Sequence, residues 1–185
     1  HLIREACRNA IYRHGGQAYR VIDVIRGKRI VSLRREFTFN ETRPHIMKKI
    51  KVRNTLKSQA FTGVKLAYVT LNVTEFLNCV TERSPHGNVV RTWNGSMGMP
   101  PHQLPTEGTM LVLRTPFWNE LKQQMQGRPE SSLQGLERLM RGLFPTISGP
   151  CDTQDFSSGT DSVATGEMAI FLYDAVYDGV GLTET

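Results

Sequence analysis

Residues 18–39, AYRVIDVIRGKRIVSLRREFTF, predict a β-hairpin. The segments 18–25 and 29–39 are rich in β-branched and aromatic residues, and the short segment RGK between them has the composition of a turn. Because both segments have the length of a strand and follow each other directly in the chain, we expect them to pair antiparallel.

Two further strands are predicted after the hairpin. They are residues 45–53 (HIMKKIKVR) and residues 63–79 (GVKLAYVTLNVTEFLNC), the second long enough to bend or split. Thr42-Arg43-Pro44 predicts a bend before them, because proline has no N–H to donate to a ladder. Consecutive strands with short turns favour a small antiparallel β-barrel or a strongly curved sheet.

Helices are predicted at two places. Residues 2–11 carry apolar side chains at three-and-four spacing, which predicts a short N-terminal helix that stops at Gly15 and Gly16. Residues 131–144 carry an apolar stripe of the same kind, and Pro145 is expected to end that helix because the residue before a proline is disfavoured in helical backbone.

The predicted fold class is therefore α+β, in three parts. Residues 1–82 would form the basic N-terminal helix plus a small antiparallel β-barrel or curved sheet. Residues 83–108, crowded with Gly, Pro, Ser and Asn, are expected to be a long loop or linker. Residues 109–185 would form a compact α/β portion, with buried strands at 109–114 and 168–173, that ends in the Tyr-Asp…Gly-Val-Gly loop.

Charge is distributed unevenly along the chain, whose formal net charge is +6. Residues 1–65 hold sixteen Lys and Arg against four Asp and Glu, whereas residues 66–185 hold seven against thirteen. An asymmetry of this kind is expected where one half of a protein faces a polyanion, although a solvated basic surface without a partner is the alternative. Cations that neutralise phosphates release counterions, which gives affinity without sequence selectivity.

The basic residues expected to contact nucleic acid lie on neighbouring predicted strands. They are Arg34, Arg35, Lys48, Lys49, Lys51 and Arg53. Successive side chains of a strand face opposite ways, so Lys49 and Lys51 share one face and Lys48 falls on the face of Ile50 and Val52. Either Lys48 therefore lies on the apolar face or the strand contains a bulge.

The cysteine content indicates a reducing compartment. Cys7, Cys79 and Cys151 are far apart and form no Cys-x-x-Cys pair, which is typical of a cytoplasmic protein rather than a disulfide-stapled secreted one. No local Cys/His cluster supplies the four ligands of a structural zinc site. No apolar run reaches eighteen residues, so no membrane partner is expected, and without a starting Met we expect the chain to begin inside a larger protein.

Motifs of nucleotide and acyl chemistry are absent from the sequence. Neither G-x-x-x-x-G-K-[ST] nor G-x-G-x-x-G occurs, and there is no G-x-S-x-G nucleophile elbow. We therefore expect no catalytic residues here and no ATP hydrolysis by this chain alone, since a motor needs a phosphate-binding lysine and magnesium ligands.

Acidic residues gather in the last third of the chain. They are Asp152, Asp155, Asp161, Glu167, Asp174 and Asp178. One interpretation is the magnesium site of a nuclease with Asp174 as first ligand. However, residues 142–185 contain no Lys, Arg or His to position water, so we favour turn and capping roles, in which carboxylates accept backbone N–H groups.

Three short motifs resemble those of a known family. Residues 12–21, YRHGGQAYRV, are similar to Y-x-H-x-G-x-x-Y-x-V, residues 151–155, CDTQD, to C-D-x-x-D, and residues 170–181, IFLYDAVYDGVG, to a strand followed by Y-D-x-x-x-G-G-x-G. The matching residues are Tyr12, His14, Gly16, Tyr19, Cys151, Asp152, Asp155, Tyr173, Asp174, Gly179 and Gly181. In this order and spacing they resemble the C-terminal accessory region of MrfA-type superfamily-two (DEAD/DEAH-box) DNA helicases.

The chain also departs from the family pattern. Arg138 stands where the family helix commonly has a histidine, and Asp178 replaces the first glycine of the G-G pair. Residues 57–129 align to nothing. A role that depends on the family histidine is therefore not carried over, and we expect the matched motif residues to be structural.

The resemblance implies a function in ATP-dependent DNA unwinding or translocation, in repair or in defence against foreign DNA. ATP and magnesium would bind to RecA-like motor domains of the same or another chain, while this chain guides the strand and braces the motor. The family's zinc cluster follows the Y-D…G-x-G loop, so it would fall beyond Thr185. A stand-alone nucleic-acid-binding domain and a metal-dependent nuclease are the alternatives.

Overall fold

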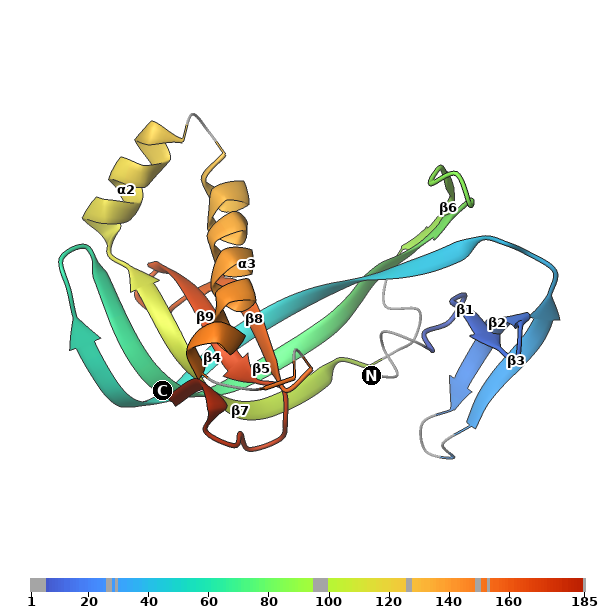
Figure 1. The fold of residues 1–185 in the computed structure, drawn as a ribbon, viewed down its shortest axis with the longest axis horizontal. Coiled ribbons are helices and arrows are strands. Elements are labelled where there is room, and N and C mark those ends of the chain that lie inside the picture. Colours follow the sequence, from blue (N-terminus) through green and yellow to red (C-terminus); the bar gives the residue numbers. More distant parts are fainter. Residues whose placement is uncertain are drawn as a thin grey trace. The chain divides into compact units, whose positions relative to one another are not determined.

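The computed structural model describes residues 6–25, 28, 30–94, 100–125, 128–148, 151–152 and 154–184. Most of these residues lie in β-strands, and the described ranges hold two α-helices (Figure 1). The chain divides into two compact units, each built from two stretches of sequence. Unit 1 consists of His1–Lys48 and Glu75–His102, and unit 2 of Lys49–Thr74 and Gln103–Thr185. No helix of the described ranges has the length and apolarity needed to cross a membrane.

A three-stranded antiparallel sheet in unit 1 contains the predicted hairpin. Its strands are β1 (Ile11–His14), β2 (Gln17–Ile25) and β3 (Ile30–Glu36), in that order. The predicted turn at residues 26–28 lies mostly outside the described residues. Gly15 and Gly16 join β1 to β2 with φ angles of 55° and 76°, and a two-residue hairpin turn that needs left-handed backbone at both positions favours glycine.

A second sheet has six strands. They are β4 (Glu41–Ala60), β5 (Val64–Arg83), β6 (Val89–Asn94), β7 (His102–Leu113), β8 (Phe156–Ser162) and β9 (Met168–Asp174). The order is β4-β5-β7-β9-β8 with β6 paired to β5, so β4 and β8 are edges and the sheet is not a closed barrel. The N–H of Ile50 on β4 donates to a carboxylate oxygen of Asp161 on β8 at 2.8 Å, so a side-chain hydrogen bond joins the two edges where a barrel would have a ladder.

Strand β9 lies at the centre of unit 2 and is covered on both faces, as its apolar run predicts. One face belongs to a cluster formed with β4, β5 and β7; this cluster consists of Ile50, Ala67, Val69, Leu71, Val73, Met110, Val112, Ala169, Phe171 and Tyr173. On the other face, Ile170 packs with Leu133, and Leu172 packs with Phe144.

Two helices follow β7. They are α2 (Thr115–Gln124) and α3 (Pro129–Ser148). Figure 1 shows α3 beside β8 and β9, where the ring of its Phe144 lies 4.7 Å from the ring of Phe156. The predicted apolar stripe of this helix is confirmed in part, because Leu133 and Phe144 are buried whereas Leu139 and Leu143 remain exposed.

Unit 1 has a smaller apolar core. Its buried members are Cys7, Ala10, Val21, Leu77 and Val80. Burial raises the pKa of the Cys7 thiol to about 11, so this thiol is neutral and serves as a small apolar side chain.

The predicted fold class is wrong at the N-terminus. Residues 6–10 form a bend and a turn instead of a helix, and Ile11 begins β1; residues 2–5 of the predicted helix lie outside the described residues. Asn9 has a φ of 70°, which no right-handed helix contains. Its N–H donates to Val21 O at 2.8 Å, so the segment bonds to β2 rather than to itself.

The predicted α/β portion is also wrong, because β7, β9 and β8 pair antiparallel. Half of the segment 83–108, expected as a loop, belongs to β6 and to the first part of β7, and residues 95–99 lie outside the described residues. The composition of that segment hides the run VVRTW, which has strand propensity and pairs with the end of β5.

Two prolines lie inside elements that they were expected to interrupt. Pro44 lies within β4, which tolerates it because an edge strand has one side without a ladder. Pro145 lies within α3, which continues to Ser148. Proline has no N–H to donate to the carbonyl four residues earlier, and that carbonyl belongs to the exposed Arg141. The buried Phe144 holds the last turn of the helix against the sheet.

Candidate nucleic-acid interface

The middle of β4 carries three exposed cations on one face. Lys49, Lys51 and Arg53 are exposed, whereas Ile50 and Val52 between them pack against the core of unit 2. Alternate residues of a strand are roughly 6.6–6.8 Å apart, so the three charges form an evenly spaced row. The row lies on an edge strand, where lysines also discourage pairing with another sheet.

The structure decides between the two alternatives left open for Lys48. Burial alternates residue by residue along β4 from Glu41 to Arg53, so the strand keeps its alternation past this lysine. Lys48 is half-buried and lies on the same face as Ile50, which means that one lysine does share the apolar face. Lys48 therefore differs from the exposed row of Lys49, Lys51 and Arg53.

Arg34 and Arg35 lie on β3 and are both exposed. The guanidinium of Arg35 lies 4.8 Å from the centre of the Phe37 ring. These two arginines belong to unit 1, like Lys48, and the row of three cations belongs to unit 2. Thr42 and Pro44, which were expected in a break before the strand, are part of β4.

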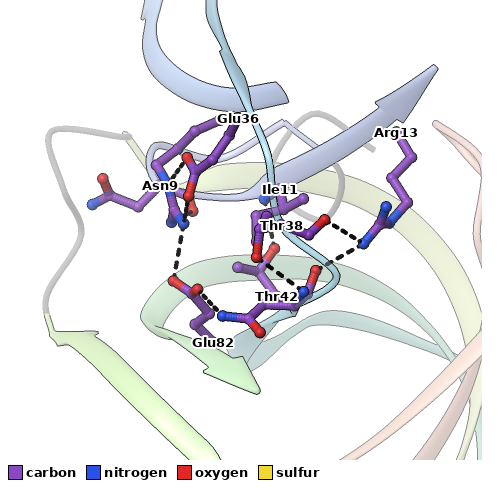
Figure 2. A network of polar contacts seen from close by, with 9 residues as sticks. Asn9, Ile11, Arg13, Glu36, Thr38, Thr42 and Glu82 are labelled. Carbon is purple, nitrogen blue, oxygen red and sulfur yellow. Dashed lines mark hydrogen bonds and ion pairs between the residues drawn. The ribbon is translucent and has the colours of Figure 1, made fainter. Parts of the chain in front are cut away.

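Arg20, in contrast, is a buried cation that cannot reach a ligand (Figure 2). Its Nε and Nη2 donate to the two carboxylate oxygens of Glu36 at 2.5 Å each, and Nη2 also donates to Glu82 at 3.0 Å. Nη1 donates to Asn9 O at 3.0 Å. Hydrogen bonding to Arg20 lowers the pKa of Glu36, and the same pairing raises the pKa of Arg20. All of these groups are occupied in holding unit 1 together.

Trp93 adds to this network. It lies on β6, is half-buried, and packs against the apolar core of unit 1. Arg20 lies 5.2 Å and Arg91 lies 5.6 Å from its ring centre. The contacts favour the interpretation of Trp93 as an aromatic anchor rather than as a base-stacking residue.

Sequence reasoning assigned no function to Phe37 and Phe39, which join β3 to β4. They are 87% and 84% exposed, more than any other large apolar side chain in the described ranges. The signal was present in the sequence, since RREFTFN places two aromatic residues at alternate positions beside two arginines.

The N-terminal motif residues build the first hairpin. Tyr12 on β1 stands opposite Tyr19 on β2, and the Tyr12 ring stacks on His14 with centroids 6.3 Å apart. Gly16 supplies the turn. Their contacts are within the hairpin.

The C-terminal motif residues organise the last loop around Asp174. This carboxylate is fully buried and accepts the N–H groups of Val180 at 2.6 Å, Leu182 at 3.3 Å and Thr183 at 3.2 Å, together with the Thr183 hydroxyl at 3.0 Å. Tyr173 before it is buried in the core. Gly179 and Gly181 have φ angles of 71° and 77°, which curl the loop back toward the carboxylate.

Three further acidic residues, Asp152, Asp155 and Glu167, also accept backbone donors. Asp152 and Asp155 close a turn in which each carboxylate receives one N–H, and Cys151 beside them packs against Phe144 and Phe156. Glu167 accepts the N–H of Thr115 and the hydroxyl of Thr165. Within the described ranges no three His, Cys, Asp or Glu side chains are grouped as a metal site would require. These contacts support the turn and capping interpretation.

No protein-family model and no curated protein matches the chain. Among solved structures, the chain is similar to the DUF1998 helicase MrfA bound to DNA, with a TM-score of 0.69 and 20% identity over 99% of this chain. For the same helicase bound to DNA and AMPPNP the values are 0.59 and 18%, and for a further crystal structure of this helicase they are 0.57 and 20%.

The chain spans about a quarter of those helicase chains, 24%, 22% and 24% respectively. The likeness extends over nearly the whole of this chain, including residues 57–129, which no motif covered. It shows that the chain shares its fold with one part of an MrfA-type helicase, and it confirms the resemblance found in the short motifs.

Proposed function

We propose that this chain, which shares its fold with part of a DNA-bound helicase, is an accessory, DNA-contacting part of an ATP-dependent DNA helicase or translocase. In this proposal the chain guides the DNA strand and braces the motor. RecA-like motor domains, in the same polypeptide or in another chain, bind and hydrolyse ATP.

The observation that carries the proposal is the exposed row of Lys49, Lys51 and Arg53. Their apolar neighbours fix the backbone of β4 in the core. Binding through the three charges therefore costs little backbone entropy. Cations of this kind contact phosphates, which position a protein on DNA but carry no sequence information. The fold shared with a helicase solved bound to DNA supports DNA as the polyanion.

The test replaces Lys49, Lys51 and Arg53 together by Ala. Their exposure means that the variant is expected to keep its fold, which circular dichroism and thermal unfolding check first. We expect weaker binding to unrelated DNA sequences alike, and a log–log salt slope lower by about 0.7–0.9 for each phosphate contact removed. Fluorescence anisotropy over a series of salt concentrations measures both quantities.

The matched control removes the same charge elsewhere. Arg128, Arg138 and Arg141 lie at the start of α3 or on it and are exposed. Their replacement by Ala is expected to change the salt slope less than the β4 variant does. Equal slopes for the two variants would show that only net charge matters, and a folded β4 variant that binds like the parent at every salt concentration would refute the proposed contact.

A further inference from the structure

The segment that joins β3 to β4 exposes two aromatic rings to solvent. Phe37 and Phe39 are 87% and 84% exposed, whereas Thr38 and Asn40 are half-buried. The burial alternates, so the two rings lie on the outer side and the polar side chains on the inner side. Exposing two neighbouring phenyl rings costs solubility, and exposed apolar patches mark contact sites or aggregation liabilities.

Hydrogen bonds hold this segment in place from its inner side (Figure 2). Arg13 Nη2 donates to Thr38 O at 3.3 Å and to Asn40 O at 3.1 Å. The N–H of Asn40 donates to the Thr38 hydroxyl at 3.1 Å, and its side-chain amide donates to Glu82 at 2.6 Å. The rings are therefore presented by a braced backbone, which lowers the entropy cost of binding through them.

The brace is itself anchored in the fold of unit 1. Glu82, which accepts from Asn40, also accepts from the buried Arg20 at 3.0 Å. Immediately after the segment, the Thr42 hydroxyl accepts the N–H of Ile11 at 2.7 Å. The chain that follows the exposed rings is thus tied to β1 and to β5.

Arginines outnumber the carboxylates around the rings: of Glu36 and Glu41, the two acidic residues between Arg34 and Arg43, Glu36 is already paired with Arg20. Arg35 lies over the Phe37 ring at 4.8 Å, and the exposed Arg34 and Arg43 flank the segment on β3 and β4. Unit 1 as a whole holds thirteen Lys and Arg against six Asp and Glu. Aromatic rings interleaved with guanidinium groups are the combination with which proteins bind single strands, because bases stack on the rings and phosphates pair with the cations.

We propose that Phe37 and Phe39 form a stacking platform for unpaired bases of a nucleic acid strand, with Arg34 and Arg35 on the neighbouring phosphates. The proposal rests on the proposed function, since it names which form of the DNA the chain holds. A phenyl ring has no hydrogen-bonding group, so the platform does not select one sequence over another. It selects unpaired over paired bases, because only unpaired bases have faces free to stack on the rings. A duplex, whose bases are already stacked, cannot use it.

The test measures the affinity of the full 185-residue chain for three probes of equal length: oligothymidine, an abasic strand with the same phosphates, and a duplex. The variant is Phe37→Leu with Phe39→Leu, which keeps apolar bulk but removes the aromatic faces. We expect its affinity for oligothymidine to fall at least about fivefold for each ring that stacks, while its affinity for the abasic strand and the duplex stays that of the parent. Replacing both residues by Trp restores the preference for oligothymidine.

The matched control is Phe61→Leu with Tyr177→Leu, which removes two other exposed rings. It is expected to bind all three probes like the parent. If the parent binds none of the probes, both the proposed function and this inference are wrong. If the parent binds, and the Phe37/Phe39 variant still prefers oligothymidine to the abasic strand, only the stacking platform is overturned.

A second copy of the chain is the competing occupant. In that case the parent sediments as a dimer, the variant Phe37→Ser with Phe39→Ser sediments as a monomer, and both bind oligothymidine equally. That set of results would overturn the stacking platform, whereas a monomeric parent together with loss of oligothymidine binding supports it.

Discussion

The two compact units are held together by different kinds of contact. The core of unit 2 is a cluster of apolar side chains from four strands, with Phe171 and Tyr173 at its centre. Unit 1 has few buried apolar residues and places the ion network of Arg20, Glu36 and Glu82 beside them. A buried ion network adds directional contacts but little net stability, and removing the shared Arg20 leaves both carboxylates without their cation.

The two units also differ in net charge. Unit 1 has an excess of cations, whereas unit 2 holds ten Lys and Arg against eleven Asp and Glu, with three of the cations in the row on β4. The apolar core of unit 2 supports the part of β4 from Lys49 onward, which carries the row of cations. Unit 1 carries charged and aromatic side chains on its surface, and its fold depends on a few polar residues.

The largest effect is expected from Arg20→Met. Without the guanidinium, the buried Glu82 keeps its hydrogen bond from Asn40 but has no cationic partner, which should cost about 3–5 kcal/mol of unfolding free energy. Urea unfolding measures the loss, and hydrogen exchange should show it first at the amides of β2 and β3. Arg91→Met, which removes an exposed arginine over the same Trp93 ring, is the control and should cost much less. A loss below about 1 kcal/mol for Arg20→Met would mean that the network is dispensable.

A smaller effect is expected at the last loop of unit 2. Asp174→Ala leaves three backbone N–H groups and one hydroxyl without their acceptor, at a cost of about 1–3 kcal/mol. The exposed neighbour Asp178→Asn is the control, because asparagine tolerates the φ of 62° found there. An unchanged melting temperature for Asp174→Ala would remove the structural explanation of the Tyr-Asp motif.

The smallest effect concerns acid. Because Arg20 lowers the pKa of Glu36 in the folded state, this pair stabilises the fold above the ordinary glutamate pKa near 4.5. The contribution is lost as the pH falls through the lowered pKa, where the folded carboxylate takes up its proton. The difference in unfolding free energy between the parent and Glu36→Gln should therefore shrink as the pH falls from 6 to about 3. A difference that stays constant over this range would contradict the charge-based stabilisation.

Local patterns predicted the fold only where local contacts decide it. The hairpin of β2 and β3, the alternation along β4 and the apolar run of β9 were all readable, since side-chain period and strand length are visible in a short window. The three-and-four spacing of residues 2–11 was misleading, because the left-handed Asn9 and its bond to Val21 depend on a neighbouring strand. The glycine pair 15–16 was the correct signal, for a hairpin turn rather than a helix end.

The candidate site was predicted as a list of cations but not as an arrangement. Lys49, Lys51 and Arg53 could be placed on one face from period alone. Arg20 is paired with Glu82, 62 residues away. This pairing follows from strand contacts that no local pattern contains. For the same reason the brace from Arg13, which distinguishes an ordered Phe37 and Phe39 from a loose loop, was invisible in the sequence.

Lysine footprinting tests the central claim most directly. The chain is treated with an acetylating reagent in the absence and presence of saturating DNA, and the modification of each lysine is measured by mass spectrometry. Lys49 and Lys51, exposed on β4, should be protected by DNA, whereas Lys122, exposed on α2, should react equally in both samples. If Lys49 and Lys51 stay as reactive as Lys122 while DNA is bound, the row on β4 is not the interface and the proposed contact is wrong.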